Sequence, residues 1–350
     1  MSGSSSSRYL LGLVAGIVLS FGLIWAYVLA MPEAFLESGY PVWKAKQSFI
    51  SSCDLGEAMI SGDSRAEAAV DPRGLDIPTR NISFGAETPV EGYFFARRAM
   101  ACATPPREMI FSFAMTGFTQ VSPFLWEDGA RFGFIHYDEL SDVSATARKL
   151  KDPSVDAVSS RLGFGGSLRN LLYVVHFPPL YFNALLRGQI FRRSGINRFT
   201  YEEARAGLGH LPYDHAAPQS PESNFNLLPV QDAFFQRTLA LLQQKNVQSY
   251  YVAMPVSETH ARRDINPAAR KAFLAYLVGL TRRYPNFHVV TPMIVSWPDE
   301  ALLDGIHLKA AYASRFTQKF RACQDAAQSQ ASPVLSCDLS AGSISDMARR

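Results

Sequence analysis

Hydrophobic and polar positions along most of this chain alternate between the pattern of strands and the pattern of helices. The apolar approach Ala58-Met59-Ile60 leads into Ser61-Gly62-Asp63-Ser64-Arg65, and residues 66–69 after it are compatible with a helix. This order predicts a strand, a tight turn and the start of a helix. Such a turn can present the Ser64 hydroxyl at the carboxyl edge of a parallel sheet, so Ser64 is the candidate nucleophile.

The same alternation continues on both sides of a long interruption. Further strands are predicted at residues 79–85, 107–118, 247–256 and 287–291, and helices at residues 89–102, 228–245, 267–283 and 308–323. The run at 107–118 is largely apolar, which is typical of a strand that is covered on both faces of a parallel sheet. Strands alternating with helices predict an α/β fold, a three-layer sandwich with a mainly parallel sheet.

The periodicity is hard to follow between residues 119 and 226, which we interpret as an insertion. It is either a cap over the sheet or a loose lid. Its glycine-rich patch, Gly163-Phe164-Gly165-Gly166, lacks the flanking strand and helix of a phosphate-binding loop and is therefore interpreted as a turn. At the other end, residues 326–350 are expected to form a polar tail outside the folded domain at 56–325.

The N-terminus predicts a membrane anchor. Residues 9–31 contain no charged side chain, and at about 1.5 Å per residue they can cross a hydrocarbon core of about 30 Å. A signal peptide cleaved near Val28-Leu29-Ala30 is the alternative, and the length of the apolar run favours the uncleaved anchor. Arg8 is the nearest flanking charge, which favours cytoplasmic residues 1–8 and places the stem at 32–55 and the domain beyond it outside the cytoplasm.

Composition and charge narrow the class of protein. The chain has 350 residues, 47% of them hydrophobic, and a formal net charge of +3, which is too small to argue for nucleic-acid binding. Four cysteines suit an oxidising compartment, and two local bridges, Cys53–Cys102 and Cys323–Cys337, are plausible. Three pairings are possible in principle, and four buried free thiols are the alternative.

A second polar segment completes the candidate site. Asp304-Gly305-Ile306-His307 lies between the last predicted strand and the last predicted helix, at the carboxyl edge where Ser64 is expected. The Asp304 carboxylate can accept a hydrogen bond from one imidazole nitrogen of His307 and leave the other free to face Ser64. His210, Asp214 and His215 are residue types that can bind a metal ion. The composition of this loop explains their grouping as chance, so no metal and no cofactor is predicted.

The two segments together resemble the SGNH/GDSL hydrolase superfamily over roughly residues 55–325. Its members carry a Gly-Asp-Ser block near the start, here Gly62-Asp63-Ser64, and an Asp-x-x-His block near the end, here Asp304 to His307. Within it the chain looks most like the membrane-anchored periplasmic proteins of alginate and exopolysaccharide O-acetylation, and like the D-alanine-transfer protein of teichoic acids. Asn81-Ile82-Ser83-Phe84-Gly85, followed by Pro89-Val90-Glu91-Gly92-Tyr93, supports that placement.

The resemblance implies roles for further residues. The backbone N–H groups of Ser64 and Gly85 would bind the oxyanion of a tetrahedral intermediate. The family often adds an asparagine after the third strand, where this chain has Met115-Thr116-Gly117, so either Thr116 is the third donor or the hole has two. Arg65 replaces the leucine of the family's namesake motif; it could bind an anionic substrate, although a salt bridge at the helix start is the simpler expectation.

These expectations define a function to be tested. The resemblance implies a serine O-acyltransferase or esterase that O-acetylates an exopolysaccharide, anchored by one span in a bacterial inner membrane with its domain in the periplasm. It also implies a polysaccharide acceptor and a membrane-bound O-acyltransferase partner that delivers the acyl group. The alternatives are a non-catalytic assembly or carbohydrate-binding component of an exopolysaccharide secretion complex, and an esterase acting on lipid or peptidoglycan.

Overall fold

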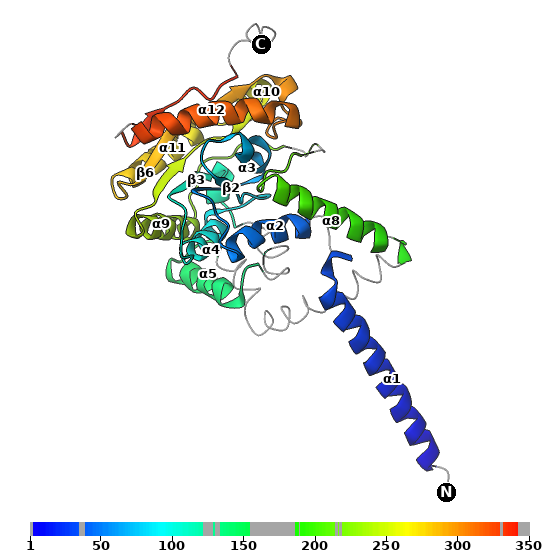
Figure 1. Cartoon of the computed structure of the whole chain (residues 1–350). Helices are drawn as coiled ribbons and strands as arrows, with labels where there is room; N and C mark the ends of the chain where they lie inside the picture. Colours follow the sequence, from blue (N-terminus) through cyan, green and yellow to red (C-terminus); the bar gives the residue numbers. More distant parts are fainter. Residues whose placement is uncertain are drawn as a thin grey trace.

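The fold was analysed in a computed structural model. It describes residues 3–34, 39–121, 129, 134–154, 186–188, 190–213, 216, 219–329 and 332–341. Within these residues the helices are α1 (Gly3–Ala30), α2 (Gly39–Ser51), α3 (Ser64–Ala69), α4 (Pro89–Ala99), α5 (Tyr137–Lys149), α8 (Ile190–Ala206), α9 (Pro229–Gln244), α10 (Glu258–Arg263), α11 (Pro267–Thr281) and α12 (Ala310–Ser329). Figure 1 shows α1 projecting away from the folded domain.

A parallel sheet forms the centre of the domain. Its strands are β2 (Thr79–Asn81), β1 (Ala58–Gly62), β3 (Glu108–Ser112), β4 (Gln248–Tyr251), β6 (Phe287–Thr291) and β8 (Val334–Ser336), in that spatial order. Every pair of neighbours among these described strands is parallel. All five residues of β1 and of β3 are buried, as expected for apolar strands covered on both faces. The predicted α/β class with a mainly parallel sheet is confirmed.

The two faces of the sheet have separate cores. Because side chains alternate along a strand, Met59, Met109 and Phe111 enter one core while Ile60 and Ile110 enter the other.

Helices cover both of these cores. The first core is closed by apolar side chains of α4, α9 and α11, including Phe94, Phe235 and Phe273. The second is closed by α3 and α12, including Ala66 and Phe316. Figure 1 shows α12 on the opposite side of the sheet from α4 and α9. This is the predicted arrangement of three layers.

The predicted stem at 32–55 is wrong for most of its length. The short 3₁₀ helix η1 (Pro32–Ala34) is followed by α2, which packs against α4 and α8 as part of the domain. Trp43 of α2 is buried, with its ring 3.9 Å from the ring of Phe84 and parallel to that of Phe134 at 5.5 Å. Phe49 and Ile50 are buried as well. The apolar side of this helix stabilises the domain because it is removed from water.

The C-terminal boundary at 325 also needs correction. Helix α12 continues to Ser329, and β8 then pairs with β6, so that Val290 lies opposite Leu335. A strand of three residues gives too short a pattern to be recognised in the sequence. Residues 342–350 of the predicted polar tail lie outside the described residues.

Three predicted strands are shorter than expected. The run at 79–85 forms β2 only at Thr79–Asn81. After β3 the run at 107–118 turns into the 3₁₀ helix η3 (Met115–Phe118). The run at 247–256 divides into β4 and β5 (Pro255–Ser257), and β5 pairs with β7 (Val295–Trp297) in a separate two-stranded sheet. The apolar patterns therefore locate these strands but not their ends.

Two further 3₁₀ helices are η2 (Pro72–Gly74) and η5 (Asp299–Ala301).

The insertion at 119–226 is described in part. Helix α5 packs against α9, and α8 packs against α2 and η1. Most of the remainder, including the glycine-rich patch at 163–166, lies outside the described residues.

All four cysteines form disulfides. Cys53 pairs with Cys102 and Cys323 pairs with Cys337, each with a Cα–Cα distance of 5.7 Å. The first bridge ties the end of α2 to the end of α4, and the second ties α12 to the residue after β8. The structure therefore contains the two local pairings expected from the sequence.

Candidate active site

The candidate nucleophile stands on a turn whose backbone is fixed on both sides. Gly62 ends β1 where β3 comes so close that a Cβ atom at this position would lie 2.7 Å from the carbonyl oxygen of Ser112. Asp63 caps α3, with its carboxylate accepting from the N–H of Arg65 at 3.0 Å. Ser64 is the first residue of α3. Glycine and aspartate are thus needed here for close backbone approach and for capping.

The Arg65 side chain is held in a buried salt bridge with Asp63. Its Nε donates to Asp63 Oδ1 at 2.9 Å and its Nη2 to Asp63 Oδ2 at 2.7 Å, with the side chain buried. This is the salt bridge at the helix start that was the simpler expectation. A planar guanidinium held by two such bonds has a fixed orientation.

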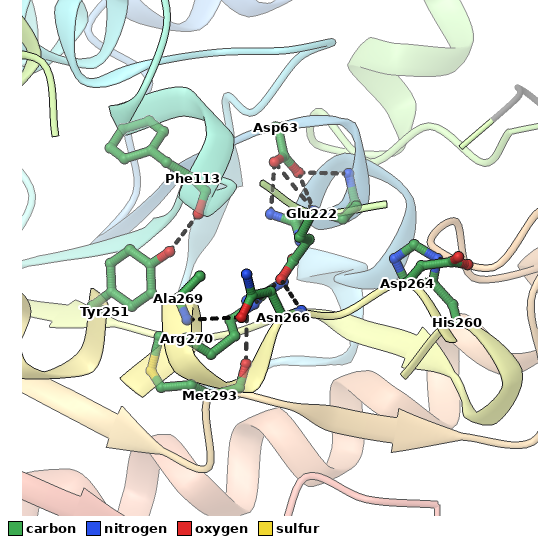
Figure 2. A network of polar contacts seen from close by, with 11 residues as sticks. Asp63, Phe113, Glu222, Tyr251, His260, Asp264, Asn266, Ala269, Arg270 and Met293 are labelled. Carbon is green, nitrogen blue, oxygen red and sulfur yellow. Dashed lines mark hydrogen bonds and ion pairs between the residues drawn. The ribbon is translucent and has the colours of Figure 1, made fainter. Parts of the chain in front are cut away.

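A second buried ion pair supports the same region. Arg270 of α11 donates from Nε to Glu222 at 3.0 Å and from Nη1 to the carbonyl of Met293 at 3.3 Å. Figure 2 shows this pair beside Asp63, and the charge of Glu222 acts on Arg65. Close by, the hydroxyl of Tyr251 donates to the carbonyl of Phe113. The polar side chains next to the serine turn therefore all have partners, which hold them in place.

Ser64, His307 and Asp304 are brought together although the serine lies 243 residues from the histidine. Ser64 Oγ is 2.7 Å from His307 Nε2, and His307 Nδ1 is 2.7 Å from Asp304 Oδ2. With a carboxylate at Nδ1 the imidazole carries its proton there, so Nε2 is the acceptor for the serine hydroxyl. This arrangement of nucleophile, base and orienting acid is the one needed for acyl transfer.

The aspartate is held by its own loop. Asp304 Oδ1 accepts from the N–H groups of Ile306 at 3.2 Å and His307 at 3.0 Å. Gln219 donates to Oδ2 at 3.4 Å, and Gly305 has the positive φ of +95° that the tight turn requires. The acid and the base are almost inaccessible, with side-chain exposures of 2% for Asp304 and 5% for His307. Burial fixes the direction in which the imidazole faces.

The expected oxyanion donor Gly85 lies next to the serine turn. Beyond the end of β2 the N–H of Ile82 donates to Ile60 at 2.8 Å and that of Phe84 to Gly62 at 3.1 Å. This pairing extends the strand to the residue before Gly85, level with the end of β1. The Asn81 side chain anchors it by donating to the carbonyls of Ala66 and Val70 in and after α3, at 2.9 and 3.0 Å.

Thr116 lies in η3, where its carbonyl accepts from the N–H of Thr119 at 3.0 Å. Among the described residues no contact joins Thr116 to Ser64. The structure therefore gives no geometric support to Thr116 as a third oxyanion donor.

Sequence reasoning missed Tyr213. Its ring lies flat against the imidazole of His307, with centroids 4.2 Å apart and planes 5° apart. Its hydroxyl hydrogen-bonds to Ser64 and lies 3.7 Å from the position that a Cβ atom of Gly85 would take. A single tyrosine in a segment without periodicity carries no signal that could have identified it.

The histidine near Tyr213 has a structural contact. His210 Nε2 is 3.0 Å from the carbonyl oxygen of Ala68, and burial lowers the pKa of His210. Asp214 and His215 lie outside the described residues. Within the described part of the chain, no three His, Cys, Asp or Glu side chains are grouped as metal ligands would be.

A buried ion pair connects α2 to the site. Lys46 Nζ is 2.6 Å from Glu67 Oε1, and both residues are 3% exposed. Glu67 is one turn after Ser64 on α3, and its charge acts on His307. Lys46 also donates to the carbonyl of Ser83, two residues before Gly85. Burial lowers the pKa of the Lys46 ammonium and raises the pKa of the Glu67 carboxyl.

Two buried glutamates lie behind the nucleophile turn. Glu87 accepts from Ser61 Oγ at 2.5 Å and from the N–H of Gly62 at 3.1 Å, and burial raises its pKa well above the usual range. Burial also raises the pKa of Glu91 to about 7. Glu91 accepts from the backbone N–H of Thr88 at 3.1 Å, forming the capping box of α4.

Comparison with known proteins adds no family. No model of a protein family matches this chain, and a search of curated proteins found no match.

The Lys46–Glu67 pair gives a testable consequence for stability. Replacing Lys46 with Met leaves a buried carboxylate without its counter-charge, which is expected to lower the free energy of unfolding by about 3–5 kcal/mol. The double variant K46M/E67L removes both charges and is expected to recover most of that loss. Urea unfolding of the full chain in detergent micelles measures both. A double variant as unstable as K46M would show that the pair is not the cause.

Proposed function

We propose that this protein is a serine acyltransferase or esterase of the SGNH type, which forms an acyl-enzyme on Ser64. The observation that carries the proposal is the continuous contact from Ser64 Oγ through His307 to Asp304, at 2.7 Å in each step. Ser64 follows β1 at the carboxyl edge of the central parallel sheet, where open α/β folds place their sites, and Asp304 and His307 reach it from the loop between β7 and α12.

The chemistry follows from the positions of the three side chains. Ser64 Oγ attacks the carbonyl carbon of an acyl ester while its proton passes to His307 Nε2, and Asp304 stabilises the imidazolium that forms. The oxyanion is held by the N–H groups of Ser64 and Gly85. When the tetrahedral intermediate collapses, the bond to the leaving alcohol breaks and His307 returns the proton to it.

The second half of the reaction reverses the roles. A hydroxyl group of the acceptor attacks the acyl-enzyme, His307 takes its proton, and the ester bond to Ser64 breaks with that proton returning to Ser64 Oγ. A sugar hydroxyl as acceptor gives O-acylation of a polysaccharide, and water gives hydrolysis. We assign the acceptor as an exopolysaccharide and the acyl group as acetyl, following the resemblance of the Gly-Asp-Ser and Asp-x-x-His segments.

The position in the cell is part of the proposal. Ser6–Tyr27 of α1 has a mean hydropathy of 2.1 and is unburied, so this helix is long and apolar enough to cross a membrane. The pairing of all four cysteines in disulfides suits a periplasmic domain. We place the chain in a bacterial inner membrane, with a membrane-bound O-acyltransferase partner to bring acyl groups to the periplasm.

A serine-reactive probe tests the function directly. A fluorophosphonate should label wild-type protein at Ser64, identified by mass analysis of the labelled peptide, because only an activated serine reacts rapidly. Ser64→Ala should abolish labelling, while Ser52→Ala, at an exposed serine of the chain, should leave it unchanged. Absence of labelling in folded wild-type protein would instead favour a non-catalytic carbohydrate-binding or assembly component.

A further inference from the structure

The segment that carries Tyr213 is fixed to the elements that build the site. The N–H of Asn81 donates to the carbonyl of Leu208 at 2.9 Å, and that of Leu211 donates to the backbone carbonyl of Glu67 at 3.3 Å. Gly209 has a φ of +95°, and a Cβ atom there would lie 1.8 Å from the carbonyl oxygen of Asn81. This contact requires glycine. The insertion thus returns along β2 and α3 and brings Tyr213 to the catalytic histidine.

The ring and the hydroxyl of Tyr213 face different reacting groups. The ring covers one face of the His307 imidazole at 4.2 Å, where the negative face of an aromatic ring attracts a cation. The imidazole is cationic only after it has taken the serine proton, so this attraction favours the transition state over the resting state. The hydroxyl hydrogen-bonds to Ser64 and lies 3.7 Å from the position that a Cβ atom of Gly85 would take, so it is close to both residues expected to bind the oxyanion.

We propose that Tyr213 is a catalytic residue that donates the third hydrogen bond to the oxyanion through its hydroxyl and stabilises the His307 imidazolium through its ring. The proposal rests on the proposed acyl-enzyme function. In the free protein the hydroxyl donates to Ser64 Oγ, and it transfers this hydrogen bond to the oxyanion as Ser64 bonds to the acyl carbon. Burial raises the pKa of Tyr213, which keeps the hydroxyl protonated. Tyr213 thereby takes the part of third donor for which the resemblance suggested Thr116.

Two substitutions separate the two contributions. Tyr213→Phe keeps the stacked ring and removes the donor, so kcat for an activated acetyl ester should fall by about 10²–10³, the effect of losing one oxyanion donor. Its pH profile should keep the wild-type midpoint. Tyr213→Leu also removes the ring, so the midpoint for the base should move to lower pH because the imidazolium is less favoured. Thermal unfolding confirms that both variants are folded.

The outcomes distinguish this proposal from the proposed function. If wild-type Ser64 does not react with a fluorophosphonate, the acyl-enzyme function fails. If wild-type Ser64 reacts and Tyr213→Phe turns over the acetyl ester at the wild-type rate or faster, Tyr213 is not an oxyanion donor. A Tyr213→Leu profile with an unchanged midpoint would remove the role of the ring.

A different observation concerns the outer face of α8. Ile196 and Phe199 on this helix are 48% and 65% exposed, and Leu186, four residues before α8, is 86% exposed. Between Ile196 and Phe199, Asn197 donates to the carbonyl of Glu33 at 2.9 Å, three residues beyond the end of α1. The part of α8 around Asn197 therefore packs against η1, where the apolar helix α1 meets the domain (Figure 1).

We infer that this face of α8 rests on the interfacial region of the bilayer that α1 spans. A phenylalanine and an isoleucine one turn apart can enter the boundary between headgroups and acyl chains, and exposed Arg187, which precedes α8, can face anionic headgroups. Arg198 is exposed as well, but its Nε is paired with Glu202 at 2.8 Å. The contact of Asn197 with the residues after α1 keeps α8 close to the membrane surface. The lipid surface is the occupant favoured by this continuity with α1.

Depth-dependent quenching tests the inference on the full chain. The probe variant carries Phe199→Trp, and the control variant carries Gln318→Trp at an exposed position of α12. Both also carry Trp25→Phe, which removes the tryptophan of α1. In nanodiscs with brominated lipids, Phe199→Trp should lose most of its added emission and Gln318→Trp should lose none. Equal quenching of the two would overturn the docking of α8. Quenching of Trp25 in the wild-type protein reports separately whether α1 spans the bilayer.

Discussion

The hydrogen bond between Ser64 and His307 is the interaction on which the remaining structure depends. It joins the first strand-to-helix connection of the domain to the last. Ser64 follows β1 at the carboxyl edge of the six-stranded sheet, where open α/β folds place their sites. The Asp304–His307 loop, which lies between β7 of the two-stranded sheet and α12, reaches the same edge. The neighbours of the serine and the histidine then have positional tasks: Gly62 allows close approach of β3, Asp63 caps α3, and Gly305 turns the chain so that Asp304 reaches the imidazole.

Buried charge extends the candidate site to α2, the helix that follows α1. Lys46 of α2 binds Glu67, one turn after Ser64, and also the carbonyl of Ser83, just before Gly85. One ammonium group therefore bridges the two segments that would supply the oxyanion donors. Since breaking a buried pair leaves an uncompensated charge, α2 is an integral part of the folded domain. The residues that follow α1 thus support the candidate site.

The sequence was most informative where a pattern is local and repeated. The apolar strands β1 and β3, the serine turn and the Asp304–His307 segment could be predicted, because burial on both faces and short polar segments between elements leave clear signals. Helix α2 was missed because its polar residues resemble a stem beside the anchor, and β8 because three residues show no period. Tyr213 could not be predicted, since its position depends on the tertiary contact between Gly209 and Asn81.

The central claim is that Ser64, His307 and Asp304 act as one unit, and a double-mutant cycle on the rate of Ser64 phosphonylation tests it most directly. The rates are measured for the wild type, His307→Ala, Asp304→Ala and the double variant. Residues that act through one another give non-additive losses. We expect Asp304→Ala to slow the reaction strongly in the wild-type background but to have little further effect once His307 is absent. Losses that multiply in the double variant would contradict the claim.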